Sequence, residues 1–400
     1  MKWTGESQAC VSRATLKFPY KKEKRSVNYF FYQTKTKYDN TGDALINKAL
    51  ISELRKYGRV FANCSAYIPV EFLEELEIRK DEQIICKNSR QFALKIIGHA
   101  LLHRQDNTYI VSGLGDIYGG GVKKVMRNVL SACVLPVYSL LGVKNVRIGR
   151  SFGVMTKAMQ WSEALRGLFV NSYFVRDTQS LQRCRSMGIS KVQLCPDMSW
   201  IYEEGTERQE NASDVVMINM KGSTLNIKEQ KYIDALIKKC KTFLERLEKE
   251  KNKKVHVLVA YQVSEDEEFS QYIYQRLKDE FDVEFVDTQM KLGDLRKYYS
   301  HCGYHLSNRM HSLLSGYKYG SLPVALIDVK NHLKIAATLK DCDLDEFMID
   351  VFDEFPESKM DNILTNKSKL YRKITICEVE QAEKIHRILS REFDRGEEKE

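Results

Sequence analysis

The segment at residues 304–327, YHLSNRMHSLLSGYKYGSLPVALI, constrains the fold more than any other part of the chain. It begins with the short apolar-flanked segment Tyr304 to Leu306, Ser307 and Asn308 are good helix caps, and the apolar residues that follow recur at helical spacing. Gly320 supplies a left-handed helix stop, and Pro323 keeps the helix from resuming, so a second strand follows. The segment therefore predicts the strand, helix and strand of an α/β domain.

Arg309 and His311 lie in the first turn of this predicted helix. Unpaired backbone N–H groups and the positive end of the helix dipole favour an anion there. On an arbitrary helix, such an arginine is a solvated surface charge and such a histidine is a satisfied, partly buried side chain. Here both follow the carboxyl end of a strand, where open α/β sheets bind ligands, and this favours a phosphate or carboxylate site.

The composition narrows the classes of partner. The chain has 400 residues, enough for two domains, and 43% of them are hydrophobic. A formal net charge of +9 suits an anionic substrate or the surface of an acidic membrane. No stretch reaches the density of basic and aromatic residues found in nucleic-acid-binding arms, so we expect no nucleic acid partner.

The ten cysteines are scattered as single residues without a CxxC pair. This spacing favours neither a zinc site nor a secreted disulfide framework, so we predict no metal site and a reducing cytosol fits best. The N-terminus has no apolar core of signal-peptide length, and no stretch approaches the roughly 20 apolar residues of a membrane span. We therefore expect a cytoplasmic protein.

Two features bear on peripheral contact with a membrane. The apolar run at residues 130–141, LSACVLPVYSLL, is too short to span a bilayer, and such a run is usually a buried helix. Its alternative interpretation is a membrane-surface contact. Basic residues clustered at positions 21–25 also give the N-terminal segment an electrostatic means of contacting a membrane face, so the inner membrane face stays open as a location.

Predicted strands and helices alternate along most of the chain, which indicates parallel sheets with helices on both faces. A polar stretch without periodicity at residues 203–213, EEGTERQENAS, marks the best domain boundary. We expect four parts: a flexible basic N-terminal segment (1–26), an N-terminal α/β domain (27–205), a C-terminal α/β domain (206–375), and a C-terminal helix with a charged tail (376–400). That last helix is predicted from about residue 378 to 393.

Polar residues precede the first predicted helix, at residues 44–57. Asn40 and Asp43 are cap-type residues at the carboxyl end of the strand predicted at 27–33, and Asp43 is either a helix cap or a ligand for a sugar hydroxyl. The sequence here is not the GxGxxG fingerprint, so a nicotinamide cofactor is not supported.

A second candidate region follows the strands predicted at residues 108–112 and 173–175. The first runs into the glycine-rich turn GLGDIYGGG at residues 113–121, where glycines let the backbone approach a ligand closely. The second runs into Arg176, at the same kind of strand-to-helix junction as Arg309. Two such arginines in separate halves of the chain suggest one anion shared between them.

From residue 28 to residue 334 the chain resembles the polysaccharide pyruvyl transferase family. The motifs that carry the resemblance are Asn40-Thr41-Gly42-Asp43, Val175-Arg176-Asp177 with Ser180, Gly188, Pro196 and Asp197 after it, and Arg309-Met310-His311-Ser312 with Pro323 and Lys334 after it. Two segments depart from the family pattern. Residues 112–116 stand in place of a plain triple glycine, and residues 150–153 in place of GIGP.

The resemblance implies a fold similar to GT-B glycosyltransferases, with two Rossmann-like domains facing a cleft, the N-terminal one on the acceptor side and the C-terminal one on the donor side. It implies transfer of a pyruvyl group from phosphoenolpyruvate to two hydroxyls of a sugar in polysaccharide biosynthesis. The product is a cyclic ketal, phosphate leaves, and no cofactor is needed beyond phosphoenolpyruvate as co-substrate. The sugar acceptor is lipid-linked, nucleotide-linked or polymeric.

The resemblance also assigns roles to residues of this chain. It implies His311 and Arg309 as catalytic residues. The implied donor-binding residues are Arg176, Arg309, Met310, His311 and Lys334, with Lys334 on the phosphate. The implied acceptor-binding residues are Asn40, Asp43, Gly113, Gly115 and Asp116.

Two other functions fit the same residues. A glycosyltransferase of this architecture would use a nucleotide-sugar donor, because helix N-termini with arginine and histidine also suit a diphosphate. A non-catalytic glycan-binding or assembly protein would keep the fold without the chemistry. The presence of Arg176, Arg309 and His311 together argues against this last function.

Overall fold

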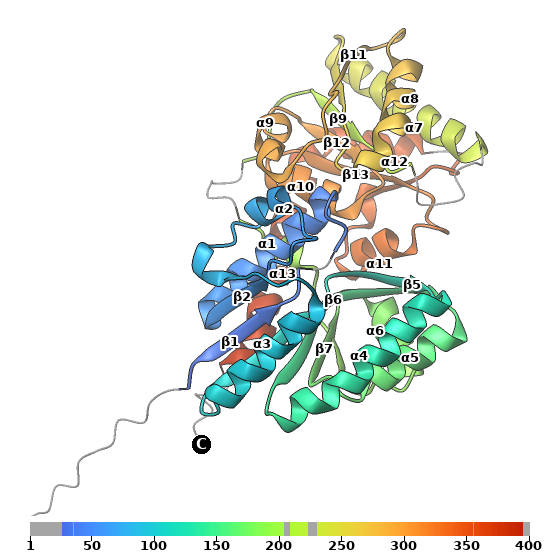
Figure 1. Ribbon diagram of the computed structural model, residues 1–400. Coiled ribbons are helices and arrows are strands. Elements are labelled where there is room, and N and C mark those ends of the chain that lie inside the picture. Colours follow the sequence, from blue (N-terminus) through green and yellow to red (C-terminus); the bar gives the residue numbers. More distant parts are fainter. Residues whose placement is uncertain (1–25, 35, 204–208, 223–229, 355, 395–400) are drawn as a thin grey trace, which may run out of the picture.

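The structure is a computed structural model and describes residues 26–34, 36–203, 209–222, 230–354 and 356–394 (Figure 1). Nearly all of the expected N-terminal segment, and the end of the charged tail, lie outside the described residues. The described chain forms two parallel sheets with helices packed on their faces, which confirms the predicted α/β class.

The first sheet has the strand order β3-β2-β1-β4-β6-β7-β8, with β5 paired to β6. Its strands are β1 (Asn28–Tyr32), β2 (Arg59–Asn63), β3 (Gln83–Ile84), β4 (Asn107–Ser112), β5 (Gly115–Gly119), β6 (Lys144–Met155), β7 (Ser172–Val175) and β8 (Val192–Leu194). Its helices are α1 (Thr41–Tyr57), α2 (Val70–Glu75), α3 (Ser89–Leu102), α4 (Val122–Leu140), α5 (Lys157–Gly167) and α6 (Thr178–Ser186). We call this part of the chain the N-domain.

The second sheet has the order β11-β10-β9-β12-β13-β14. Its strands are β9 (Val216–Asn219), β10 (His256–Val259), β11 (Asp282–Phe285), β12 (Tyr304–Ser307), β13 (Leu322–Ile327) and β14 (Met348–Asp350). Its helices are α7 (Gln230–Lys251), α8 (Glu267–Leu277), α9 (Leu295–Tyr299), α10 (Met310–Lys318), α11 (Leu333–Asp341) and α12 (Glu357–Thr365), and we call this part the C-domain. The last helix, α13 (Lys367–Phe393), contacts both domains.

Side chains of β1 alternate between the two faces of the first sheet, as the period of a strand requires. Phe30 and Tyr32 join the large core that continues into the C-domain, whereas Phe31 joins a second core beneath α3, α4 and α5. Phe31 lies opposite Phe61 on β2 and Ile110 on β4. Burial on both faces explains why β1 reads as a continuous aromatic run.

The predicted segment at residues 304–327 is confirmed as β12, α10 and β13, and β12 and β13 pair in parallel. The chain leaves the first sheet at Leu194 and enters the second sheet at Val216, and the expected domain boundary lies between these two residues. Other predicted bounds are wrong. The sequence also predicts a strand at residues 144–148, but β6 continues seven residues beyond residue 148, because β5 supplies an extra pairing partner there. Part of the predicted glycine turn therefore forms β5 itself.

The apolar run at residues 130–141 forms most of α4, but the expectation of a buried helix is wrong. Ala132, Leu135 and Tyr138 face the core, whereas Leu130 and Leu140 are exposed by 65% and 87%. Among the described residues, no helix combines the length and the hydrophobicity that crossing a bilayer requires.

Helix α13 begins eleven residues before the predicted start at residue 378, so the expected boundary between residues 375 and 376 falls inside it. At its C-terminal end the Phe393 ring packs against Phe30 and Tyr109 of the N-domain. In its middle, the Glu378 carboxylate forms an ion pair with Lys318 of α10. The helix thus fastens the two domains together.

The Lys318–Glu378 pair supplies a test of that role. Both side chains are almost fully buried, Lys318 Nζ also donates to the Trp200 carbonyl at 2.8 Å, and Tyr317 donates to Glu378 at 2.6 Å. Replacing Glu378 with Ala leaves a buried ammonium without its carboxylate, so the free energy of unfolding should fall by about 3–5 kcal/mol in urea titrations. The control Val379→Ala, at an exposed neighbour on the same helix, should change it by less than about 0.5 kcal/mol.

Candidate functional site

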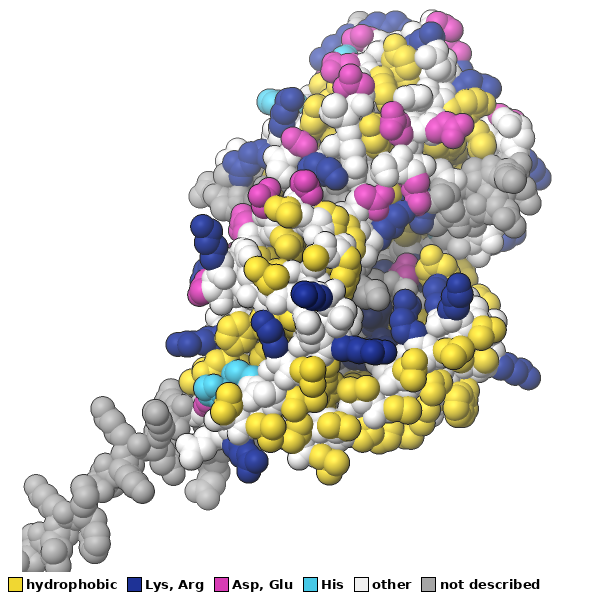
Figure 2. All heavy atoms as spheres, in the orientation of Figure 1, with side chains coloured by type: hydrophobic (Ala, Val, Ile, Leu, Met, Phe, Trp, Pro, Cys, Tyr) yellow, Lys and Arg dark blue, Asp and Glu magenta, His cyan; other side chains and the backbone are white. Residues whose placement is uncertain are grey.

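The candidate site lies where three elements of the two domains meet. Helix α1 begins beside α10, and β7 ends facing the start of α10 (Figure 1). The three strand-to-helix junctions involved are β1 to α1, β7 to α6 and β12 to α10. Each lies at the carboxyl end of a parallel strand, the usual position of ligand sites in open α/β sheets. Figure 2 shows the surface hollowed between the two domains, with Lys and Arg side chains around the hollow.

Arg176 forms the centre of the site, and its guanidinium has partners on every side. Its Nη1 donates to Asp197 Oδ2 at 2.7 Å, and its Nη2 donates to Asp116 Oδ1 at 2.8 Å. Its Nε donates to the Ser151 hydroxyl at 2.6 Å. Burial alone would lower the pKa of Arg176, but the carboxylates of Asp197 and Asp116 raise it, so this cation is permanently charged.

His311 reaches this cluster from the C-domain. Its Nε2 lies 3.2 Å from Arg176 Nη1 and 3.3 Å from Asp197 Oδ2. An arginine N–H only donates and a carboxylate only accepts, so the neutral tautomer with a bare Nε2 suits Arg176 and a protonated Nε2 suits Asp197. The site therefore holds a histidine that can gain or lose a proton at Nε2 and find a partner in either state.

The carboxylate of Asp197 is held ionised. Burial alone would raise its pKa, but His311 and Arg176 outweigh burial and keep the pKa well below its usual range. Its Oδ1 accepts from the backbone and the hydroxyl of Ser199, which fixes the orientation of the carboxyl group. Asp197 can thus stabilise an imidazolium without taking its proton.

Asp116 joins Arg176 to Lys334. Lys334 Nζ, on α11, lies 2.6 Å from Asp116 Oδ2, and Asp116 lies on β5 of the N-domain. Burial alone would raise the pKa of Asp116, but Arg176 and Lys334 lower it; burial lowers the pKa of Lys334 despite this partner. Asp116 was expected among the acceptor residues, yet its contacts are with two residues expected on the donor side.

The start of α1 packs directly against His311. Asn40 caps the helix by accepting from the Gly42 N–H at 3.0 Å, which brings Gly42 against the imidazole. A Cβ on Gly42 would lie 2.7 Å from His311 Cβ and 2.8 Å from Nδ1, distances that real Cβ atoms do not show. A glycine is therefore required here for space.

Asn40 and Asp43 are occupied by contacts within this loop and with the C-domain. Asp43 accepts from the Thr36 hydroxyl at 2.5 Å, from the Lys37 N–H and from Asn40 Nδ2, so its oxygens bind the loop before α1. The N-cap of α1 is Asn40, so the helix-cap interpretation of Asp43 is wrong. Thr41, the residue after Asn40, donates to the Met290 carbonyl at 2.7 Å. These bonds hold the α1 N-terminus against the C-domain.

Arg309 points to a different partner. It forms an ion pair with Asp266, which is buried and also accepts from the Gly222 N–H at 3.1 Å. Burial lowers the pKa of Arg309 despite this carboxylate. In the described residues no hydrogen bond or ion pair joins Arg309 to Arg176, so the structure does not bring the two arginines into contact. The next residue, Met310, is partly buried and packs against the core.

The sequence analysis missed one cation, Arg150, which lies within β6 where its pairing with β7 shifts register. Its Nε is buried and has no hydrogen-bond partner among the described residues, and it would lie 3.1 Å from a Cβ on Gly113. Burial, and then the nearby Arg147, lower the pKa of Arg150 to about 10. Gly113 and Gly115 both have positive φ, 123° and 99°, so the loop beside Arg150 follows a path that favours glycine.

Asp197 and Ser151 were also without an assigned role in the sequence analysis. The signal for Asp197 was present, because residues 192–195 predict a strand and the pair Pro196-Asp197 follows it, as Arg176 follows the strand predicted at 173–175. Ser151 stands in a segment that departs from the family pattern, so nothing in the pattern pointed to it. It also donates to Asp177 at 2.7 Å, and Asp177 caps α6.

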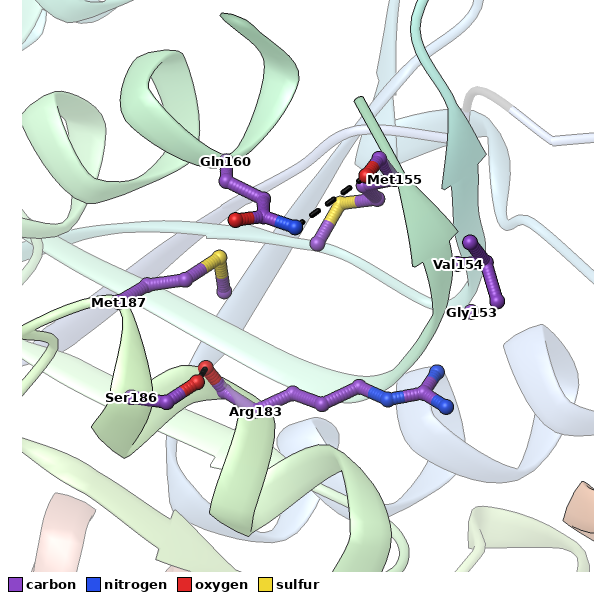
Figure 3. Close-up of a pocket in the computed structure, with 7 residues that line it drawn as sticks. All are labelled: Gly153, Val154, Met155, Gln160, Arg183, Ser186 and Met187. Atoms are coloured by element: carbon purple, nitrogen blue, oxygen red, sulfur yellow. Dashed lines mark hydrogen bonds between the residues drawn. The ribbon is translucent and has the colours of Figure 1, made fainter. Parts of the chain in front are cut away.

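A separate open pocket lies on the N-domain between the end of β6, α5 and the end of α6 (Figure 3). It has a volume of about 190 Å³ and is lined by Gly153, Val154, Met155, Gln160, Arg183, Ser186 and Met187. In Figure 3 the Arg183 side chain extends toward Gly153 and Val154. None of the ionic residues around Arg176 lines this pocket.

Solved structures share the fold at very low sequence identity. A UDP-N-acetylglucosamine 2-epimerase matches with a TM-score of 0.53 and 10% identity, over 94% of this chain and 98% of the epimerase. Anabaena HepE in complex with UDP matches with a TM-score of 0.54 and 10% identity, over 92% of this chain and 100% of HepE. These neighbours are GT-B-like, so the expected fold is confirmed.

Sequence comparison is more specific. A search of curated proteins finds no similar sequence. Residues 40–320 match the family described as polysaccharide pyruvyl transferase, and this range includes all three motifs and every residue around Arg176 except Lys334. The chain therefore belongs to the polysaccharide pyruvyl transferase family.

Proposed function

We propose that this protein transfers the pyruvyl group of phosphoenolpyruvate to two hydroxyls of one sugar and releases phosphate. The observation that carries the proposal is the contact of His311 with Arg176 and Asp197 across the domain boundary. It combines a fixed cation with a histidine that has a partner in both protonation states. Family membership supports the pyruvyl group as the one transferred.

The reaction needs proton transfer at two points. Protonation of the enol CH₂ carbon gives a methyl group and makes C2 electrophilic. One sugar hydroxyl then adds to C2, and the second displaces phosphate from it. Two C–O bonds to the sugar form, the C2–O bond to phosphate breaks, and the two hydroxyl protons end on the methyl group and on phosphate. Such steps gain from a side chain with a pKa near neutrality.

In this proposal His311 handles the protons. The imidazolium, stabilised by the Asp197 carboxylate 3.3 Å away, protonates the enol carbon. The resulting bare Nε2 then accepts the proton of the attacking hydroxyl, while Arg176 Nη1 lies 3.2 Å away as a donor to the neutral ring. Gly42 and the α1 N-terminus keep the ring in place.

The donor's phosphate and carboxylate need cations that the protein has not already neutralised. Arg176 is bound by two carboxylates and Arg309 by Asp266, so neither supplies a whole charge to the donor. Lys334 shares the Asp116 carboxylate with Arg176, so it is only partly neutralised, and its ammonium has three N–H donors. We propose that Arg150 and Lys334 bind the donor's anionic groups, while Arg176 orients His311 and Asp197.

The proposed function is tested by incubating the protein with phosphoenolpyruvate, or with a panel of nucleotide sugars, and lipid-linked and nucleotide-linked hexose acceptors. We expect acceptor-dependent phosphate release from phosphoenolpyruvate, and product heavier than the acceptor by one pyruvate less one water. We also expect isothermal titration to show binding of phosphoenolpyruvate to the protein alone. This measurement needs no acceptor, so it tests the donor even if the panel lacks the right sugar. Absence of that binding, together with glycosyl transfer from a nucleotide sugar, would overturn the proposal in favour of a glycosyltransferase.

Replacing His311 with Gln tests the proton-transfer role. Glutamine keeps a similar volume but cannot exchange a proton, so phosphate release should fall by about 10²- to 10⁴-fold. The dissociation constant for phosphoenolpyruvate should change less than about threefold, because the cations remain. His301→Gln, at an exposed histidine, is the control and should keep full activity. Wild-type turnover in His311→Gln would remove His311 from catalysis.

Replacing Gly42 with Ala tests the packing of the α1 N-terminus on the imidazole. The new methyl group must displace His311, so turnover should fall at least about tenfold while the melting temperature falls by only a few degrees. Gly98→Ala is the matched control, because it lies inside α3 with no atom within 4 Å of the new Cβ. That variant should keep its activity and gain a little stability. Equal turnover in both variants would contradict the proposed contact.

Replacing Arg150 with Gln tests whether this arginine binds the anionic groups of phosphoenolpyruvate. Losing a charged hydrogen-bond donor to the phosphate or carboxylate should raise the dissociation constant for phosphoenolpyruvate about 10- to 100-fold. Isothermal titration measures this directly. Arg185→Gln, at an exposed arginine of α6, should leave the constant unchanged. An unchanged constant in Arg150→Gln would assign donor binding to other cations.

A further inference from the structure

The outward side of α4 is apolar along the whole helix. The exposed apolar side chains recur every three or four residues and are Val122, Met126, Leu130, Val134, Val137 and Leu140. Met126, Leu130 and Leu140 expose 58%, 65% and 87% of their surface. Single exposed apolar residues are ordinary, but a continuous helical stripe of them indicates a binding surface. We call this stripe the α4 face.

Helix α5 extends the apolar surface. It packs beside α4, where Asn128 Nδ2 donates to Ser162 Oγ at 3.1 Å, and the residue before Ser162 is Trp161, exposed by 61%. Figure 2 shows hydrophobic side chains gathered over the part of the N-domain where Figure 1 draws α3 and α4. Tryptophan prefers the boundary between water and the apolar interior of a bilayer.

The charges around the α4 face are of one sign. The sequence has no Asp or Glu between Asp116 and Glu163, and Glu163 itself is buried. The exposed charged side chains that flank the stripe are cationic: Lys123, Lys124 and Arg127 at the start of α4, and Lys157 at the start of α5. Within residues 117–162 the apolar stripe is flanked only by cations, which is complementary to a lipid surface with anionic headgroups.

We propose that the α4 face docks the protein onto the surface of a bilayer that contains anionic lipids. The apolar side chains enter the boundary between headgroups and acyl chains, and the flanking lysines and arginine contact the headgroup phosphates. The proposal rests on this surface alone and does not depend on the proposed reaction. It also differs from the electrostatic contact expected of the N-terminal segment, because it uses the body of the N-domain.

A second copy of this chain fits the same face less well. A two-fold dimer brings the same patch of both molecules together, so the interface would contain Lys123, Lys124 and Arg127 of both copies. The face offers no carboxylate to compensate them, since the sequence from residue 117 to 162 has none. A bilayer instead supplies the anions.

Docking in this way has a consequence for the candidate site. Helix α4 begins at Val122, six residues after Asp116, so its N-terminal end lies next to the strand that carries part of the site. A docked molecule therefore holds the Asp116 edge of the site close to the headgroups. A sugar carried by a membrane lipid would reach the site from that side.

The test is flotation of the full-length protein with vesicles of phosphatidylcholine alone or with 30% phosphatidylglycerol. We expect flotation with the anionic vesicles and a partition coefficient at least about tenfold lower for Leu130→Glu, because a charge would replace a leucine that enters the bilayer. The same substitution at Val379, an exposed apolar residue of α13, is the control and should change nothing. Failure of the wild type to float, or equal flotation of both variants, would overturn the proposal.

Two further measurements distinguish docking of the α4 face on a bilayer from membrane contact by the N-terminal segment and from a dimer of this chain. Tryptophan fluorescence should shift to shorter wavelength with anionic vesicles, and Trp161→Phe should lose that shift. Contact made only by the N-terminal segment, which carries Trp3, would keep the shift in Trp161→Phe and overturn the proposal. Light scattering reports the oligomeric state. A wild-type dimer that Leu130→Glu converts to monomer, without flotation of the wild type, would assign the face to a second copy instead.

Discussion

The site depends on one interaction above the others, the binding of the Arg176 guanidinium between Asp197 and Asp116. A cation with carboxylates on two sides stays charged and stays in one orientation. That orientation presents Nη1 to the His311 imidazole across the domain boundary. The ionic network of the N-domain thus sets the electrostatic surroundings of a side chain that belongs to the C-domain.

The rest of the architecture keeps these groups in register. The start of α1 is bonded through Thr41 to Met290, in the C-domain loop after β11, and it leaves no space beside His311 for a side chain on residue 42. Helix α13 fastens the domains on another side, through Phe393 in one and Glu378 in the other. Two separate attachments define the relative position of the domains better than one, and proton transfer requires such definition.

The sequence was sufficient to predict the fold class and the junctions at which the site lies. Strand-to-helix junctions are local features, set by caps, glycines and apolar spacing, so Arg176 and His311 could be located correctly on their elements. Pairing between distant residues could not be predicted in the same way. The partner of Arg309 is Asp266, 43 residues away on another element, and nothing in either segment specifies that ion pair. The same holds for Arg150, because an arginine whose buried Nε has no hydrogen-bond partner is recognised only after its neighbours are known. The apolar run at residues 130–141 shows a further limit, because composition does not reveal which side of a helix has a partner.

The continuous α13 also affects how the molecule can open for its substrates. The chain passes from the first sheet to the second between Leu194 and Val216, and it returns to the N-domain through α13. Two covalent connections fix a line in space, and rotation about that line is the softest motion left to the pair of domains. Sliding of one domain over the other would have to bend a helix of 27 residues or pull Phe393 from its aromatic neighbours. We therefore expect the hollow between the two domains to open by a hinge rotation about the line through these two connections.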